Sequence, residues 1–245
     1  MQQKFRDKII STIDLCSMFF AIKLKPSSQK YTNFWYNKRL LTFKRLIMGL
    51  KSSTYVAMHA ARNTYSQENF LTFLRMKGIS PGSEECPIQD IEDCILLYID
   101  DIAVFTPNNI KDATKLHLLI LEFVFYATGK MGFKMKKSKV NVMCPVFKFL
   151  GHQFNTGDVS TQIPEDKAEA FTNLRAPLSC AEAISRLGAL NYFSSYIPLL
   201  RTIGAPIQTM AQSGEFFWGR EQSLAWETIK LLCSVKFKNM TPLPD

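Results

Sequence analysis

Two adjacent aspartates inside an apolar segment constrain this chain more than any other feature of its sequence. Asp100 and Asp101 interrupt the run CILLYIDDIAVF at residues 94–105, which contains no other charged residue. The run predicts a hairpin of two short strands that turns at residues 99–101. An unpaired buried carboxylate costs several kcal/mol, so two of them at this turn need a counter-charge. The alternative is that Asp-Asp only forms an exposed turn, where aspartate is common.

A divalent cation is the natural counter-charge for such a pair. Mg²⁺ prefers carboxylate oxygens and usually binds through one or two of them, which leaves positions for water and phosphate oxygens. Asp14 is a third isolated carboxylate, near the end of a strand predicted over residues 9–15. Carboxylates delivered by several strand ends are typical of a two-metal site for phosphoryl transfer. We therefore expect the three aspartates to converge on two Mg²⁺ ions, with Mn²⁺ as a possible substitute.

The charged residues are unevenly distributed along the chain. The 245 residues include 30 Lys and Arg against 21 Asp and Glu, which gives a net charge of +9. Residues 23–51 carry eight Lys and Arg without an acid, and residues 130–148 carry six Lys without an acid, whereas residues 84–101 hold seven acids. Clustered basic residues bind nucleic-acid backbones through the phosphates. Two basic segments around a carboxylate centre favour a nucleotidyl transferase.

Hydrophobic periodicity and turn residues predict the remaining elements. In the first part of the chain these are a strand over 40–46, helices over 53–74 and 108–128, and a hairpin around Pro145 over 141–154. Three further helices follow: one begins near residue 164, one begins at residue 179, and one spans residues 221–235. Ser179 and Glu182 form a capping-box pattern at the start of one of these helices. We expect a mixed α/β body over residues 1–157 and an all-helical piece over residues 158–245.

Cysteine usage and hydropathy exclude several classes of protein. The six cysteines are scattered, with no CxxC pair and no histidine at ligand spacing, so neither a disulfide framework nor a zinc site is expected. A reducing, intracellular compartment is the expected location. No run of 18 apolar residues occurs, so we expect no membrane-spanning helix and no membrane partner.

Six segments of the chain resemble reverse transcriptases of retroviruses and long-terminal-repeat retrotransposons, in the order of that family. YIDD in LLYIDDIAVF resembles the YxDD box, and TIDLCSMFFAIKL resembles the segment with the first catalytic aspartate. QKYTNFWYNKRLLTFKRLIMGLKSST resembles the stretch that follows it, and KSKV…FKFLGHQF resembles the conserved-lysine region and the primer grip. LSCAEAISRLGALNYFSSYIPLLRTIGAPI resembles the thumb helices, and FFWGREQSLAWETIK…LPD the start of the connection.

The resemblance implies an α+β fold, a right-hand polymerase palm of antiparallel sheet and helices with partial fingers over 1–157. A helical thumb and the start of the connection would occupy 158–245. The implied function is template-directed DNA synthesis by an RNA-directed DNA polymerase with two Mg²⁺ ions. Its partners would be an RNA/DNA template–primer duplex and deoxynucleoside triphosphates, with the rest of a polyprotein as a further partner. The implied location is a cytoplasmic particle or the nucleus.

The resemblance also implies roles for individual residues. The catalytic and metal-binding residues would be Asp14, Asp100 and Asp101; the nucleotide-binding residues Phe19, Met48, Gly49, Tyr98 and Lys139; and the primer grip Phe149, Leu150, Gly151 and His152. Phe19 corresponds to an aromatic that excludes a ribose 2′-OH by steric contact, and Lys139 to a lysine that assists the leaving pyrophosphate. The alternatives are a core aromatic for Phe19, a solvated basic face for Lys139 and an ordinary histidine at position 152.

Three features depart from the family pattern. Ile47-Met48-Gly49 stands where relatives often have Pro-Gln-Gly or Phe-Gly, and Met48 offers no amide hydrogen bond. The acidic loop over residues 78–94 is longer than expected. The sequence begins just before Asp14, without the upstream fingers half, and no RNase H domain follows. We therefore keep a second hypothesis, a catalytically inactive, retroelement-derived nucleic-acid-binding remnant, and a third, a structural α/β protein whose Asp-Asp is only a turn.

Overall fold

The computed structural model of the chain describes residues 7–157, 160–235 and 239–240. It divides into two compact units, one of which is Phe5–Leu150 and the other of which contains Gly151–Asp245. The division lies close to the domain boundary predicted at residue 157. The description of these units as palm with partial fingers and as thumb remains a prediction.

An antiparallel sheet with strand order β4-β5-β1-β6 forms the centre of the first unit. Its strands are β1 (Lys8–Cys16), β4 (Ile95–Tyr98), β5 (Asp101–Pro107) and β6 (Lys134–Asn141). Residues 102–106 of β5 are all buried, as expected for a strand covered on both faces. The strand predicted over 9–15 and the hairpin predicted over 94–105 are confirmed by β1 and by the β4–β5 pair.

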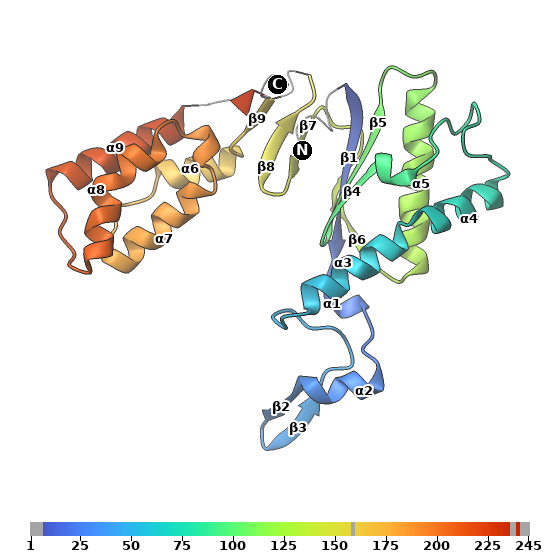
Figure 1. Cartoon of the computed structure of the whole chain (residues 1–245), viewed down its shortest axis with the longest axis horizontal. Helices are drawn as coiled ribbons and strands as arrows, with labels where there is room; N and C mark the ends of the chain where they lie inside the picture. Colours follow the sequence, from blue (N-terminus) through green and yellow to red (C-terminus); the bar gives the residue numbers. More distant parts are fainter. Residues whose placement is uncertain (1–6, 158–159, 236–238, 241–245) are drawn as a thin grey trace. The chain divides into compact units, whose positions relative to one another are not determined.

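Helices of the first unit pack around an apolar core, although the short helix Pro26–Gln29 buries none of its residues. They are α1 (Met18–Ala21), α2 (Pro26–Gln29), α3 (Ser53–Thr64), α4 (Gln67–Lys77) and α5 (Ala113–Lys130), with 3-10 turns at Lys30–Thr32 and Ile91–Asp93. Figure 1 shows α5 alongside the sheet, and its buried residues Ile120, Phe123 and Val124 pack in the same cluster as Ile13 of β1. The predicted single helix over 53–74 is wrong, because Ser66 begins a new helix: its Oγ accepts the Asn69 N–H at 3.4 Å.

Three other short strands differ from the sequence prediction. β2 (Asn33–Tyr36) and β3 (Arg39–Thr42) form a hairpin whose turn residues Asn37 and Lys38 both have positive φ. The strand predicted over 40–46 was therefore too long, although Arg45 forms an isolated bridge with Lys23. The predicted hairpin around Pro145 is wrong, because β6 and β7 (Val146–Phe149), on either side of this proline, belong to different sheets and do not pair with each other.

The second unit consists mainly of helices. They are α6 (Glu165–Thr172), α7 (Cys180–Asn191), α8 (Leu200–Ser213) and α9 (Arg220–Ser234), with a 3-10 turn at Ser194–Tyr196. Trp226, Ile229 and Ile207 belong to their common core. The stretch expected to be all-helical also contains β9 (Ser160–Gln162) and β10 (Asn239–Met240), and β9 pairs with β8 (His152–Asn155) as well as with β10. None of the helices in the described ranges is long and apolar enough to span a membrane.

Candidate active site

The register of the central sheet brings two of the three predicted catalytic aspartates together. Asp14 and Asp101 are direct partners at the end of the antiparallel β1–β5 ladder. The Leu15 N–H extends this ladder by donating to the Asp100 carbonyl oxygen at 2.8 Å. Side chains directly opposite each other in an antiparallel pair lie on one face, with their Cβ atoms about 5 Å apart. Asp14 and Asp101 therefore share one end and one face of the sheet, and Asp100 is next to them in the turn.

A strained turn presents Asp100 at this end of the sheet. Ile99 has φ 55°, in the left-handed region that β-branched residues rarely adopt. Its N–H donates to the thioether Sδ of Met58, on α3, at 2.8 Å. α3 thus supports the turn through a residue that the sequence analysis did not identify. The sequence predicted a helix over 53–74, but nothing in it linked Met58 to the turn.

An irregularity in β6 brings Lys139 to Asp14. Ile13 pairs with Val140 and Leu15 pairs with Met135, so the single residue Asp14 faces four residues of β6, 136–139. A strand irregularity of this kind redirects side chains. The Lys139 Nζ donates to the Asp14 Oδ2 at 2.7 Å, which joins two predicted site residues across 125 positions of sequence.

The carboxylates interact electrostatically. Partial burial raises the pKa of Asp101 above its ordinary value, and the neighbouring charges of Asp100 and Asp14 raise it further, while Lys139 opposes the shift. The hydrogen bond to Asp14 in turn raises the pKa of Lys139. The three aspartates thus form one negative cluster, with an ammonium group as a partial counter-charge.

The chemistry of this cluster fits a hard divalent cation. Across the part of the chain that the structure describes, no three His, Cys, Asp or Glu side chains are already arranged as a metal site. Mg²⁺ does not need three, because it commonly binds through one or two carboxylates and completes its shell with water and substrate phosphates. Asp14 and Asp101 are the residues that could hold such an ion, with Asp100 available from the turn.

Two of the predicted nucleotide-binding residues, Phe19 and Met48, lie on segments that are hydrogen-bonded to each other. Phe19, in α1, is half-buried against the core, whereas Met48 and Tyr98 are exposed. The Leu46 N–H donates to the Ile22 carbonyl oxygen at 2.9 Å, which links the segments of Phe19 and Met48. Tyr98 is the direct β4 partner of Asp101. Gly49 has φ 91°, a backbone conformation that a side chain would strain.

The predicted primer-grip residues form a turn between two strands. Phe149 is buried at the end of β7, and Leu150 and Gly151 follow with φ values of 49° and 73°. A Cβ at Gly151 would lie 3.3 Å from the Tyr192 hydroxyl. Both this close contact and the positive φ therefore favour glycine at position 151.

His152 is held by an aromatic cluster within the second unit. Its Nδ1 lies 2.9 Å from the Tyr196 hydroxyl, and its ring stacks on Tyr192 with centroids 5.2 Å apart. Burial lowers its pKa. These contacts describe a well-packed histidine, and its assignment to a primer grip remains a prediction.

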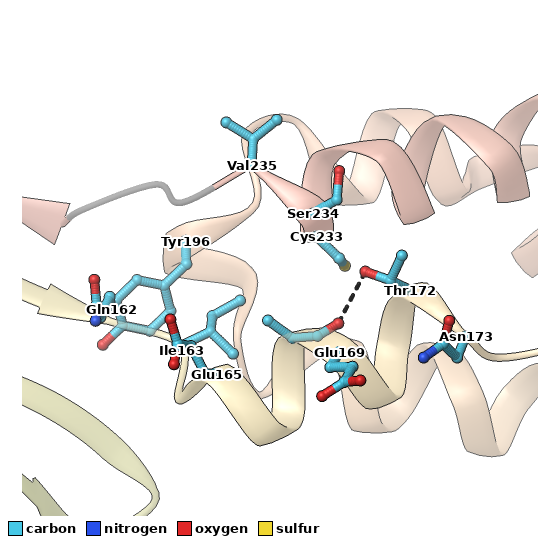
Figure 2. Close-up of a pocket in the computed structure, with 11 residues that line it drawn as sticks. Gln162, Ile163, Glu165, Glu169, Thr172, Asn173, Tyr196, Cys233, Ser234 and Val235 are labelled. Atoms are coloured by element: carbon cyan, nitrogen blue, oxygen red, sulfur yellow. Dashed lines mark hydrogen bonds between the residues drawn. The ribbon is translucent and has the colours of Figure 1, made fainter.

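A cavity of about 340 Å³ in the second unit contains none of the predicted site residues. Figure 2 shows it between α6 and the end of α9, with Tyr196, Glu169 and Cys233 among the side chains around it. Burial raises the pKa of the Cys233 thiol to about 11, which keeps it protonated and unreactive at neutral pH. The aspartate cluster of the first unit therefore remains the candidate active site.

The chain is similar in sequence to viral polyproteins. The chain is 24% identical to the Gag-Pol polyprotein of feline leukemia virus over 90% of its own length and 12% of the viral protein. It is also 24% identical to the Pro-Pol polyprotein of feline foamy virus, over 92% of the chain and 17% of the relative. The chain thus spans less than a fifth of the length of these curated relatives.

A solved structure and a family description complete the comparison. The foamy viral protease-reverse transcriptase in complex with an RNA/DNA hybrid superimposes with a TM-score of 0.71 at 21% identity, over 95% of this chain and 28% of that one, which supports the α+β polymerase fold. Residues 1–154 match the family described as reverse transcriptase (RNA-dependent DNA polymerase). Since the match covers more than half of its residues, this chain belongs to the reverse transcriptase family.

Proposed function

We propose that this chain is the polymerase core of an RNA-directed DNA polymerase that extends a primer by two-metal nucleotidyl transfer. The observation that carries this proposal is the pairing of Asp14 with Asp101 at the end of the β1–β5 ladder. It supports a shared metal site because two carboxylates on one face repel each other unless a cation lies between them.

In the proposed reaction the primer 3′-oxygen attacks the α-phosphorus of a deoxynucleoside triphosphate. One P–O bond forms, the bond to the β-phosphate breaks, and pyrophosphate leaves. When bound, the two Mg²⁺ ions would activate the attacking hydroxyl and neutralise charge on the leaving oxygens. Asp14 and Asp101 would hold these ions, with Asp100 as a further ligand.

Other side chains would position the substrate. Lys139 would transfer a proton to the leaving pyrophosphate and is already hydrogen-bonded to Asp14. Phe19 would exclude a ribose 2′-OH, and Met48, Gly49 and Tyr98 would contact the incoming nucleotide. The primer terminus would lie on the turn from Phe149 to His152.

The proposed partners are a template–primer duplex and deoxynucleoside triphosphates. The related foamy viral enzyme has been captured with an RNA/DNA hybrid and with double-stranded DNA. The net charge of +9 and the two acid-free basic segments support phosphate-backbone binding by this chain as well.

Primer extension on an RNA template with Mg²⁺ tests the proposal. We expect deoxynucleotide incorporation by the chain and a loss on the order of 10³-fold in the Asp100→Asn and Asp101→Asn variants, since each loses a charge from the metal site. Asp112→Asn is the matched control, because this exposed aspartate precedes α5 and pairs with Lys115 on the same element. Extension that persists in both active-site variants would contradict the proposed site.

A binding-only function is the second candidate, and the Asp14–Lys139 ion pair favours it, since the ammonium group already neutralises one proposed ligand. In that case Asp100→Asn should leave the affinity for a template–primer duplex unchanged or raise it. Mg²⁺ should not change the affinity of the wild-type chain, and no extension product should form when it is added. Extension by the wild-type chain that disappears in Asp100→Asn would exclude this candidate.

A further inference from the structure

The hairpin formed by β2 and β3 exposes an unusual number of aromatic rings. Every residue of both strands is exposed, and Phe34 and Tyr36 retain 38% and 61% of their accessible surface. A two-stranded hairpin on its own is marginally stable in water, so aromatic side chains that contact no core do little for the fold. Exposed apolar surface of this kind marks an interaction site.

The strand register sorts these side chains onto two faces. Phe34 pairs with Leu41 and Tyr36 pairs with Arg39, and side chains two positions apart share a face. One face, here called the Tyr36 face, consists of Phe34, Tyr36, Arg39, Leu41 and Phe43. The Phe34 and Phe43 rings are stacked with centroids 5.0 Å apart, as expected for residues on a common face. The opposite face carries Trp35 and Leu40.

Hydrogen bonds at the base of the hairpin fix its conformation. Thr32 is buried, and its Oγ1 donates to the Phe43 carbonyl oxygen at 3.1 Å and accepts the Phe43 N–H at 3.0 Å. The Arg45 guanidinium donates to the Ala21 carbonyl oxygen at 2.7 Å, beside the bridge between Lys23 and Arg45. The Tyr36 face is thus preorganised, which lowers the entropy cost of binding a ligand.

The charge around the hairpin identifies the kind of ligand. Residues 15–67 contain no acid at all. Arg39 lies on the Tyr36 face and Lys38 in the turn, and no carboxylate among the described residues forms an ion pair with either. A second copy of the chain would bring the same cations together, which is unfavourable. A polyanion with accessible flat rings matches both the charge and the aromatics.

We propose that the Tyr36 face binds single-stranded nucleic acid. Bases would stack on Tyr36 and on the Phe34–Phe43 pair, while Arg39 and Lys38 neutralise the adjacent phosphates. A fully paired duplex buries its base faces in its own stack, so the face selects unpaired strands. The site is separate from the aspartate cluster and does not depend on polymerase activity.

Fluorescence anisotropy of labelled oligonucleotides tests this proposal with the full chain carrying Asp100→Asn, which prevents synthesis. The probes are dT and rU strands of about 15 nucleotides, within the range of known single-strand sites, and a blunt duplex of equal length. We expect Tyr36→Leu to weaken single-strand binding roughly 5- to 150-fold, since it removes a stacking ring but keeps an apolar side chain. Arg39→Gln should lower the slope of log K against log salt by about 0.7.

Trp35→Leu is the matched control, because Trp35 lies on the opposite face of the same hairpin and should leave single-strand affinity unchanged. Equal losses in Trp35→Leu and Tyr36→Leu, or tighter binding of the blunt duplex than of both single strands, would overturn the proposal. So would a Tyr36→Leu variant with unchanged affinity but altered sedimentation, which would indicate self-association. If the wild-type chain fails to extend a primer, this result would contradict the proposed polymerase activity but would not contradict the proposed single-strand binding site.

Discussion

At the scale of single residues, the contact between Asp14 and Lys139 joins two predicted site residues in one ion pair. The Lys139 side chain is half exposed, so solvent screens the pair and its contribution to folding is small. In the proposed reaction, its protonated amine next to the carboxylates would donate to the leaving pyrophosphate.

We expect Lys139→Gln to reduce kcat roughly 10²- to 10⁴-fold, the range typical of losing a general acid, with a smaller change in KM. The thermal midpoint should stay near that of the unmodified chain. Lys137→Gln is the control, because Lys137 is an exposed lysine of the same strand. Single-turnover primer extension measures the effect. Equal losses in the two variants would contradict a specific role of Lys139 and would indicate that both lysines only contribute to a basic surface.

A buried histidine makes the stability of the first unit depend on pH. His117, on α5, is fully buried, with one ring nitrogen 2.7 Å from the Ser11 Oγ and the other 3.0 Å from the Thr106 Oγ1. Burial lowers its pKa from 6.5 to about 4. The folded state therefore prefers neutral imidazole, whereas the unfolded state takes up a proton below pH 6.5.

The contribution of neutral His117 to the free energy of unfolding is complete above pH 6.5. As the pH falls from 6.5 towards 4, the free energy of unfolding decreases by up to about 3 kcal/mol. Urea unfolding between pH 7.5 and pH 4 measures this loss. The His117→Gln variant should have a lower free energy of unfolding at neutral pH, and this free energy should change less with pH across the same range. An unmodified chain with the same free energy of unfolding at both ends would show that His117 titrates normally.

At the scale of elements, the sequence predicted those parts of the fold that depend on local pattern. β1 and the β4–β5 hairpin follow from apolar runs and a turn, and their pairing then brings Asp14 to Asp101. β6 was missed because its lysine-rich sequence has no alternating pattern, and its irregular register depends on β1. α8 was not predicted as a separate helix because Gly204 and Pro206 lie inside it, and tertiary packing outweighs their low helix propensity.

The break between α3 and α4 allows a prediction with a definite sign. Ser66 has extended backbone and caps α4 through Asn69. Ser66→Ala should therefore destabilise the chain by about 1 kcal/mol, as the loss of an N-cap does. In a continuous helix over 53–74 the same change would stabilise it, since alanine is the better helix former. Equilibrium unfolding distinguishes the two, and Ser52→Ala is the control because the Ser52 side chain makes no cap hydrogen bond.

At the scale of the whole molecule, the residues that the structure describes form two separate apolar cores. One contains Phe123 and Phe70 and belongs to Phe5–Leu150, and the other contains Trp226 and Ile229 and lies beyond Gly151. Each core is built from side chains of its own unit alone. Units with separate cores commonly unfold as separate cooperative transitions.

We therefore expect two calorimetric transitions, each sensitive to substitutions in its own core. Phe123→Ala should lower one midpoint, because a buried phenylalanine loses about 3–5 kcal/mol on truncation, and leave the other unchanged. Ile229→Ala should do the reverse, at a cost of about 2–5 kcal/mol. The two variants act as controls for each other. A single transition shifted by both substitutions would mean that the two units unfold cooperatively. A destabilising substitution near the aspartate cluster would then also lower the thermal stability of the helices beyond Gly151.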